Sequence, residues 1–317
     1  MDTVWFEPAG RANAPLEDSD LVIAGLVRNG GRRLRRNIEI LRTAFGAARS
    51  LHFIVVESDS TDDTPASLAA LERDIPNFRA ISLGALSKRL PRRTERIAHC
   101  RNAYLEALES CAGFDASGYV VVADLDGVNG ALDPASVATC FSSQTPWDVC
   151  TANQDDFYYD VWALRHPIWS PDDCWASYDA LIPVMGPRQA LELAVHARMV
   201  RLDPDAPMIP VVSAFGGLAI YRAAILSGAR YAAWDETGAL VCEHVPFHAA
   251  LAARGCRIVI NPRLLNARTT HHAWHKKRIA RAMRRLFPRL YRPDPQGTGE
   301  TSRLVAGLKS VRAFVAR

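Results

Sequence analysis

Two aspartates follow the most apolar short run of the chain, Tyr-Val-Val-Val-Ala at residues 119–123. Such a run is typical of a buried strand, and residues two apart on a strand point to the same side. We therefore expect the carboxylates of Asp124 and Asp126 to lie together as far as the strand persists. Paired carboxylates bind Mn²⁺ or Mg²⁺, which keep waters and accept phosphate oxygens as further ligands. The plain alternative is a pair of aspartates that caps the next turn.

A second cluster of Ser, Thr, Asp and Glu side chains covers residues 57–64 and follows an apolar run at residues 52–56. We assign residues 61–64 to capping of the next helix, because such side chains accept bonds from its free N–H groups. Glu57 and Asp59 are expected instead to accept hydrogen bonds from a nucleotide base or from ribose hydroxyls. The cluster thus predicts a nucleotide contact.

Four further residues are candidates for holding phosphates. Arg96 and Arg101 lie a little over one turn apart on a helix predicted just before the acidic strand. Their forked guanidinium groups suit diphosphate oxygens, although a solvated basic helix face is the alternative. Arg28 and Asn29 directly follow the first apolar run of the chain and are similar candidates for nucleotide contact.

Strands and helices alternate along the first half of the chain and would position these residues. The alternation indicates an α/β fold with a Rossmann-like, mostly parallel sheet and helices on both faces. Ligands of such sheets bind outside the carboxyl ends of the strands, so the polar loops should meet at one crevice. The expected strands are 21–27, 52–56, 78–83 and 119–123, and the expected helices lie around 34–45, 68–75 and 92–108.

The second half of the chain has a weaker pattern. Residues 147–210 are rich in aromatic residues, Asp and Pro, and only a helix over 187–200 is predicted there. We interpret this stretch as an insertion on the acceptor side. Regular structure is expected again over 211–221, in a helix over 243–254 and in a strand over 257–261.

Composition excludes several classes of protein. The 317 residues are 49% apolar and 23% charged, which is typical of a globular domain. Seven scattered cysteines indicate buried thiols in a reducing compartment rather than a disulfide framework. No signal peptide and no apolar run of membrane-spanning length are found. We expect a cytoplasmic protein, soluble or peripheral at the inner face of a membrane.

Four ordered segments resemble a known family. They are Glu-Ser-Asp-Ser-Thr-Asp-Asp-Thr at 57–64, Arg-Ile-Ala-His-Cys-Arg-Asn at 96–102, Tyr-Asp-Val-Trp-Ala-Leu-Arg at 159–165 and Cys-Glu-His-Val-Pro-Phe-His at 242–248. With them the chain resembles the fungal capsule-associated α-1,3-mannosyltransferases, which are glycosyltransferases of the GT-A fold. The resemblance covers residues 21–267. Two departures are Asp59, where a small residue such as Gly is usual, and the segment Ser-Ala-Phe-Gly-Gly at 213–217.

The resemblance implies a nucleotide-sugar donor, a divalent metal and a polysaccharide or glycolipid acceptor. GDP-mannose is the favoured donor with a UDP-sugar as the alternative, and retention of anomeric configuration is favoured over inversion. Glu243 is the leading catalytic residue, because it opens a helix whose pattern resembles the acidic motif of many GT-A enzymes. It would be the general base of an inverting enzyme or a positioning group of a retaining one. A carboxylate that favours the helix N-terminus is the plain alternative.

Further site residues also come from the resemblance. Asp160 is a second catalytic candidate that binds sugar hydroxyls, and Trp162 would stack on a sugar ring, unless both belong to an ordinary core edge. His244 is expected to contact acceptor or sugar. GT-A proteins often supply a histidine to the metal, so His272 is expected as the third ligand beside the two aspartates. A pair of surface histidines is the alternative.

Three parts are expected along the chain. Residues 1–20 form a polar segment, residues 21–270 form the GT-A domain with a nucleotide-binding half (21–130) and an acceptor-side half (131–270), and residues 271–317 form a basic helical extension. Residues 276–292 contain eight Lys or Arg and no acidic residue. Apolar residues fall on one face of this predicted cationic helix, which would pack on the domain and touch an anionic membrane. No nucleic-acid-binding motif is found.

The sequence as a whole predicts a metal-dependent glycosyltransferase, a hexosyltransferase, that serves polysaccharide synthesis. Two other functions stay open. A nucleotidyltransferase acting on a sugar phosphate would also use strand-end carboxylates and Mg²⁺, but a glycine-rich basic phosphate loop after the first strand is missing. A catalytically silent module that binds nucleotide sugars is the third.

Overall fold

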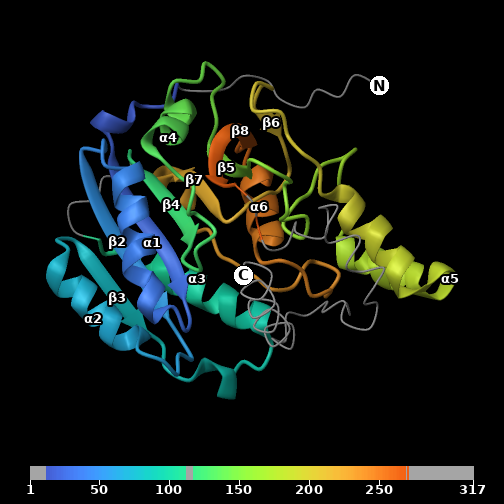
Figure 1. Ribbon diagram of the computed structural model, residues 1–317, viewed down its shortest axis with the longest axis horizontal. Helices are drawn as coiled ribbons and strands as arrows, with labels where there is room; N and C mark the ends of the chain where they lie inside the picture. Colours follow the sequence, from blue (N-terminus) through green and yellow to red (C-terminus); the bar gives the residue numbers. More distant parts are fainter. Residues whose placement is uncertain (1–11, 112–116, 269, 271–317) are drawn as a thin grey trace, which may run out of the picture.

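The computed structural model describes residues 12–111, 117–268 and 270. Their centre is an eight-stranded sheet with the order β3-β2-β1-β4-β7-β5-β8-β6 (Figure 1). The strands are β1 Asp20–Val27, β2 Ser50–Glu57, β3 Phe78–Ser82, β4 Tyr119–Asp124, β5 Val149–Gln154, β6 Ile209–Pro210, β7 Leu218–Arg222 and β8 Ile258–Ala267. The helices are α1 Gly31–Ala44, α2 Thr64–Asp74, α3 Arg93–Glu109, α4 Pro134–Phe141, α5 Cys174–Ala194 and α6 His244–Ala253. Short 3-10 turns are η1 Leu16–Asp18, η2 Leu86–Lys88, η3 His196–Arg198 and η4 Ala223–Leu226.

Six strands of the sheet run in one direction. β2 pairs in parallel with β1 and β3, and β1 pairs in parallel with β4. β7 lies antiparallel between β4 and β5, β8 is parallel to β5, and β6 is antiparallel to β8. The predicted fold class, a mostly parallel Rossmann-like α/β sheet, is therefore confirmed.

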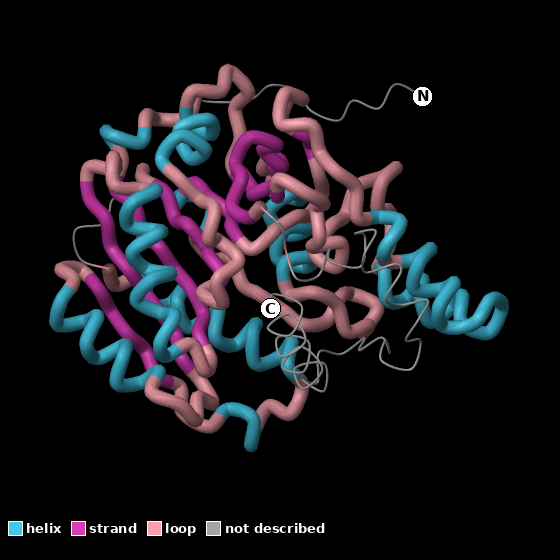
Figure 2. Tube along the Cα trace, viewed as in Figure 1, coloured by secondary structure: helices cyan, strands magenta, loops and turns pink. Residues whose placement is uncertain are grey.

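Alternating strand residues divide the core into two layers. Val22, Val56 and Val122 belong to one buried cluster, which also contains residues of α3 and α6. Their neighbours Ile23 and Val55 belong to the other cluster, together with residues of α1, α2 and α4. Helices thus cover both faces of the sheet, as expected from the pattern, and Figure 2 shows them on its two sides.

The first half follows the expected elements closely, whereas the second half needs corrections. α4 and β5 were not expected. The β5 sequence, Val-Cys-Thr-Ala-Asn-Gln, is fully buried although half of its residues are polar, so hydropathy did not reveal it. β8 extends beyond the predicted 257–261 to Ala267, with irregular pairing around Pro262. Within 211–221 only the last part is a strand, β7.

Helix α5 starts earlier than predicted and ends earlier. Asp173 caps its N-terminus by accepting hydrogen bonds from the N–H groups of Trp175 and Ala176, so the helix begins well before residue 187. Gly186 has a φ of +79° and kinks the helix between Pro183 and Pro187. The helix extends outward, at the side of the molecule away from β3 (Figure 1).

The ends of the chain are described only in part. Within the described residues, Asn13 exchanges hydrogen bonds with the backbone of Trp147, which ties the start of the chain to the main body. The predicted basic helical extension over 271–317 lies outside the described residues. Among the helices that the structure describes, none combines the length and the apolar character needed to cross a membrane.

Candidate active site

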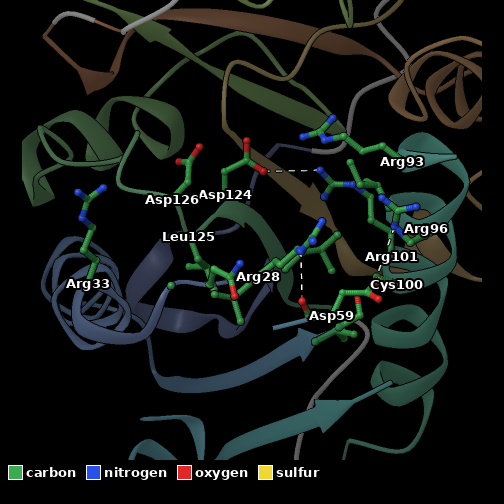
Figure 3. Close-up of a pocket in the computed structure, with 17 residues that line it drawn as sticks. Arg28, Arg33, Asp59, Arg93, Arg96, Cys100, Arg101, Asp124, Leu125 and Asp126 are labelled. Atoms are coloured by element: carbon green, nitrogen blue, oxygen red, sulfur yellow. Dashed lines mark hydrogen bonds and ion pairs between the residues drawn. The ribbon is translucent and has the colours of Figure 1, made fainter. Parts of the chain in front are cut away.

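A pocket of about 400 Å³ opens at the carboxyl ends of β1, β2 and β4, where the strand order predicts a ligand crevice. The loops after these three strands contribute to it, and so does α3 (Figure 3). Arginine is the most frequent charged residue of its lining. The charged lining residues are Arg28, Arg33, Asp59, Arg93, Arg96, Arg101, Asp124 and Asp126.

Asp124 and Asp126 both line this pocket, but they do not share a strand. β4 ends at Asp124, and Asp126 lies in the following turn, where its Oδ1 accepts a hydrogen bond from the N–H of Val128 at 3.0 Å. The turn, rather than strand periodicity, brings the two carboxylates to one side of the pocket (Figure 3). The amide of Asn129 donates to the carbonyl oxygen of Asp124 at 2.8 Å and fixes the turn.

The electrostatic setting of Asp124 is unusual for a pocket carboxylate. Burial raises its pKa to about 7, the Arg101 guanidinium opposes this, and the nearby charges of Asp126, Asp160 and Glu243 add to the rise. Solvent weakens the shift, because 36% of the side chain stays exposed. A cation placed beside Asp124 and Asp126 would therefore be stabilised by carboxylates that otherwise repel each other.

The two aspartates fit a divalent metal ion that would take further oxygen ligands from a phosphate. Both are oxygen ligands, and both face the pocket (Figure 3). Within the described residues, no group of three His, Cys, Asp or Glu side chains is arranged to hold a metal ion. His272, predicted as the third ligand, lies outside the described residues.

Arg101 joins the pocket to Glu243, which lies deeper in the protein. Its Nε donates to Glu243 Oε1 at 2.9 Å, and an Nη atom lies 3.7 Å from Asp124 Oδ1. The guanidinium is sandwiched between the rings of Phe215 and Tyr231, at 5.1 and 5.5 Å from their centroids. Only 4% of the Arg101 side chain is exposed. The residue therefore acts mainly as a buried charge between two carboxylates.

Asp59 lies beside two arginines at the other side of the pocket. Arg28 donates from Nε to the Asp59 carbonyl oxygen at 3.3 Å, and Arg96 Nε lies 3.9 Å from Asp59 Oδ2. Arg96 is held in place, because one of its Nη atoms donates to the carbonyl oxygens of Leu90 and Pro91. Arg28, Arg96 and Asp59, which the sequence suggested separately as nucleotide contacts, thus lie together in the structure.

Glu57 and Asn29 are used by the protein itself. Glu57 does not line the pocket; its two carboxylate oxygens accept bonds from the N–H of Ser60 and the hydroxyl of Ser82. Asn29 lines the pocket with a φ of +52°, and its side-chain oxygen accepts from the N–H of Thr61 at 2.8 Å. Both residues therefore fix the loops that carry Arg28 and Asp59.

The residues predicted to cap α2 have a divided role. Asp62 Oδ1 accepts from the N–H of Thr64, the first residue of α2, whereas the N-cap residue Asp63 makes no capping bond with its side chain. The Thr64 hydroxyl instead accepts from the N–H groups of Gly30 and Gly31 at the start of α1. One loop therefore satisfies the N-termini of two helices beside the pocket.

Asp160 does not line the pocket, but it is coupled to the loop before β7. Its Oδ2 accepts from the N–H of Gly216 at 3.0 Å, and the carbonyl oxygen of Gly217 accepts from the N–H of Asp124 at 3.0 Å. Burial raises the pKa of Asp160 to about 6, the bond from Gly216 opposes the rise, and the charge of Glu243 adds to it. A two-glycine turn therefore connects Asp160 with Asp124.

His244 is buried and Trp162 is half-buried, and neither lines the pocket. The His244 side chain is 1% exposed and stacks on Phe215 with a centroid distance of 3.9 Å. Its Nε2 lies 3.7 Å from Glu243 Oε1, and burial lowers its pKa well below the usual value, so the ring is neutral. Trp162 packs against two apolar clusters.

Two arginines of the pocket, Arg33 and Arg93, were not among the sequence candidates. Each lies in the first turn of its helix, α1 or α3. A cation at a helix N-terminus interacts unfavourably with the helix dipole. Arginines in the first turn of a predicted helix are therefore a signal in the sequence that could have identified Arg33 and Arg93 as candidates.

No family model and no curated protein matches the chain, so its resemblance to the fungal capsule-associated mannosyltransferases stays a prediction. Several solved structures are similar at low identity. The mannosyltransferase PcManGT from Pyrobaculum calidifontis, in complex with GDP-Man and Mn²⁺, is 16% identical with a TM-score of 0.47 over 92% of this chain and 71% of that one. S. aureus TarS 1–349 is 15% identical with a TM-score of 0.42, over 87% of this chain and 66% of that one. Glucosyl-3-phosphoglycerate synthase from Mycobacterium tuberculosis, in complex with UDP, is 14% identical with a TM-score of 0.39, over 84% and 78%.

Proposed function

We propose that this protein is a metal-dependent glycosyltransferase that transfers a hexose from a nucleotide-sugar donor. One observation carries the proposal: the carboxylates of Asp124 and Asp126 share a single pocket with Arg28, Arg96 and Arg101 at the carboxyl ends of β1, β2 and β4. Carboxylates bind divalent cations and arginines bind phosphate oxygens, so a pocket with both kinds of side chain suits a metal-bound diphosphate.

In this proposal the pocket binds the donor by its diphosphate. Arg28 and Arg96 would donate to phosphate oxygens, and Asp124 and Asp126 would hold Mn²⁺ or Mg²⁺. Such an ion, when bound, would supply positive charge for the leaving nucleoside diphosphate. Arg101 adds positive charge beside Asp124, because one of its Nη atoms lies 3.7 Å from Asp124 Oδ1.

Glu243 and Asp160 are proposed to act on the sugar side. Glu243 is 6% exposed and bonded to Arg101, which suits a fixed positioning charge better than a base that takes a proton. Asp160, with its pKa raised to about 6, is mainly ionised at neutral pH and would stabilise positive charge at the anomeric carbon. This arrangement supports a transfer with retention of configuration.

The finer points of substrate follow the resemblance. We propose GDP-mannose as the donor and a glycan or lipid-linked glycan as the acceptor, at the inner face of a membrane. The proposal does not include Glu57, Trp162 or His244 as ligand contacts. Both carboxylate oxygens of Glu57 accept bonds from serines, His244 stacks on Phe215, and Trp162 packs against two apolar clusters.

The test measures the affinity of the purified protein for GDP and UDP with and without Mn²⁺, by isothermal titration calorimetry. The variant Asp126→Ala should weaken metal-dependent binding about tenfold or more. Asp126 is exposed and lies in a turn, so the fold should persist, and Asp179→Ala on the exposed face of α5 is the matched control. Unchanged metal dependence in Asp126→Ala would overturn the assignment of the metal site.

Product analysis separates the competing functions. A glycosyltransferase releases a nucleoside diphosphate from the donor when the acceptor glycan is present. A nucleotidyltransferase releases pyrophosphate from a nucleoside triphosphate and a sugar phosphate, and a silent module binds the donor without turnover. Pyrophosphate release, or tight binding without turnover across an acceptor panel, would contradict the transferase.

A further inference from the structure

Three amide side chains lie buried around the two-glycine turn before β7. They are Gln154 at the end of β5, Asn266 near the end of β8 and Asn129 in the loop after β4, with exposed fractions of 0%, 0% and 5%. None of them lines the pocket. Burying an amide costs free energy unless its hydrogen bonds are made, so three buried amides at one place suggest a specific role.

The three amides form a chain in which each donates to the next. Gln154 Nε2 donates to Asn266 Oδ1 at 3.1 Å, and Asn266 Nδ2 donates to Asn129 Oδ1 at 2.8 Å. Asn129 Nδ2 in turn donates to the carbonyl oxygen of Asp124 at 2.8 Å. At the other end, Gln154 Oε1 accepts from the N–H of Tyr159 at 3.3 Å. The chain therefore runs from the loop after β5 to the end of β4.

The second hydrogen of each amide is donated to the two-glycine turn. Gln154 Nε2 and Asn266 Nδ2 both donate to the carbonyl oxygen of Gly216, at 3.0 and 2.8 Å. Asn129 Nδ2 donates to the carbonyl oxygen of Gly217 at 3.1 Å. Every donor and every acceptor of the three amides is thus used. A buried polar network that is fully bonded makes its surroundings rigid.

The turn needs such support, because its two residues are glycines and both have positive φ values. Glycine has the largest backbone freedom of all residues, so the turn would not keep its shape by itself. The same turn contacts both carboxylates of the site: the N–H of Gly216 donates to Asp160 Oδ2, and the carbonyl oxygen of Gly217 accepts from the N–H of Asp124, each at 3.0 Å. By fixing the turn, the amides fix the separation of Asp124 and Asp160.

A neighbouring amide shows what a buried amide without this task is like. Asn153 precedes Gln154 on β5 and is also 0% exposed. Its Nδ2 donates to the carbonyl oxygen of Pro262 at 2.9 Å, but its Oδ1 has no hydrogen-bond partner among the described residues. It ties β5 to β8 away from the turn. Complete bonding is therefore a property of the amides that surround the turn.

We propose that Gln154, Asn266 and Asn129 are positioning residues of the transferase. They act through the two-glycine turn and hold the metal-site carboxylate Asp124 and the sugar-side carboxylate Asp160 in one fixed arrangement. The inference rests on the proposed function, because it takes Asp124 as a metal ligand and Asp160 as a contact to the sugar. It extends the site to side chains that touch no ligand themselves.

The test exchanges one buried amide for an apolar side chain of similar size. Asn266→Leu removes the bonds to Asn129 and to the turn. Asn153→Leu makes the same exchange at an equally buried position of the neighbouring strand and is the matched control. Urea unfolding gives the free energy of unfolding of both variants. Electron paramagnetic resonance of unbound Mn²⁺ gives their affinity for Mn²⁺ in the presence of GDP and, separately, of UDP.

Both variants should lower the free energy of unfolding, because each leaves a buried carbonyl oxygen with fewer donors. Asn266→Leu should in addition weaken Mn²⁺ binding about tenfold, the usual size of the effect when a partner that orients a metal ligand is lost. Asn153→Leu should leave the Mn²⁺ affinity unchanged. An unchanged affinity in Asn266→Leu, or an equal loss in both variants, would overturn the inference while leaving the metal site in place.

Gln154→Met is a second variant, in case Asn266→Leu does not fold. It keeps the length of the side chain but removes both donors one amide further from Asp124. It should also weaken Mn²⁺ binding, and an affinity equal to that of the wild type would contradict the proposed chain.

A readout without metal separates the inference from the proposed function. In the metal-free protein, hydrogen exchange of the Gly216 and Asp124 N–H groups, followed by NMR, should be faster in Asn266→Leu and unchanged in Asn153→Leu. Equal exchange in the two variants would show that the amides do not hold the turn. Failure of the wild type to bind Mn²⁺ with either nucleotide would instead overturn the proposed function.

Discussion

Neighbouring carboxylates of this protein differ in how tightly they hold a proton. Asp59 keeps a lowered pKa because Ser87 and two arginines outweigh its burial. Asp124 and Asp160 have raised pKa values of about 7 and about 6, since burial dominates and other carboxylates lie near. Groups whose environments push their pKa values apart commonly mark a functional site. The difference supports separate roles for Asp59 and Asp160.

The raised pKa of Asp160 predicts a pH-dependent contribution to stability. Its carboxyl binds a proton more tightly in the folded protein than in the unfolded chain, where the pKa is near 3.8. Its contribution is present below pH 3.8 and is lost as the pH rises through about 6. The variant Asp160→Asn stays neutral, and its amide oxygen can still accept the bond from Gly216. The melting temperature of Asp160→Asn should therefore exceed that of the wild type by more at pH 7.5 than at pH 4.5.

Differential scanning calorimetry at the two pH values checks this prediction. The exposed variant Asp179→Asn should show nearly the same difference from the wild type at both. If Asp160→Asn also shows the same difference at both values, the raised pKa is refuted.

At the scale of elements, the turn before β7 connects the two sides of the site. Gly216 and Gly217 have φ values of +70° and +86°. A Cβ atom on Gly216 would lie 2.7 Å from the carbonyl oxygen of Ala152, and one on Gly217 would lie 2.7 Å from a methyl group of Val128. Glycine is therefore required for close packing as well as for backbone conformation.

A pair of alanine variants separates these two requirements. Gly228 has a φ of +68°, but a Cβ there meets no atom within 4 Å. Gly228→Ala should lower the free energy of unfolding only by the cost of placing alanine in a left-handed backbone conformation, about 1–2 kcal/mol. Gly216→Ala should lower the free energy of unfolding by more, because the carbonyl of Ala152 must move. Urea unfolding measures both; equal losses would show that the turn accommodates a side chain.

At the scale of the molecule, the sheet continues across the boundary predicted between the two halves. β4 of the first half pairs with β7 of the second along residues 119–123, and Arg101 bonds to Glu243. One buried cluster contains Val56 from the first half and Phe247 from the second. We therefore expect the two halves to unfold together.

Two spectroscopic probes test this cooperativity. Six of the seven tryptophans follow residue 130, so tryptophan fluorescence reports mainly on the second half, whereas far-ultraviolet circular dichroism reports on both. The urea transitions from the two probes should coincide. Separate midpoints would mean that the halves are independent units, as the division at residue 130 by itself would allow.

The sequence by itself determined the elements of the first half and the rim position of Asp124, Asp126, Arg28 and Asp59. These follow from local periodicity and from the rule that parallel strands end at one edge. It did not reveal β5, because polar residues such as Asn153 are buried there by a bond to Pro262 on β8. Such a strand is stabilised by partners that local hydropathy does not show.

Only the tertiary structure decided which residues act together. Arg101 was expected to bind a diphosphate, but its main partner is Glu243, 142 residues away. Glu57 and Asp59 looked equivalent in the sequence, yet Ser60 and Ser82 bond to both oxygens of Glu57, whereas Ser87 bonds to one oxygen of Asp59 and the other lies 3.9 Å from Arg96 without a hydrogen bond. Hydrogen-bond partners distant along the chain decide which polar group stays available to a ligand, and no local pattern encodes them.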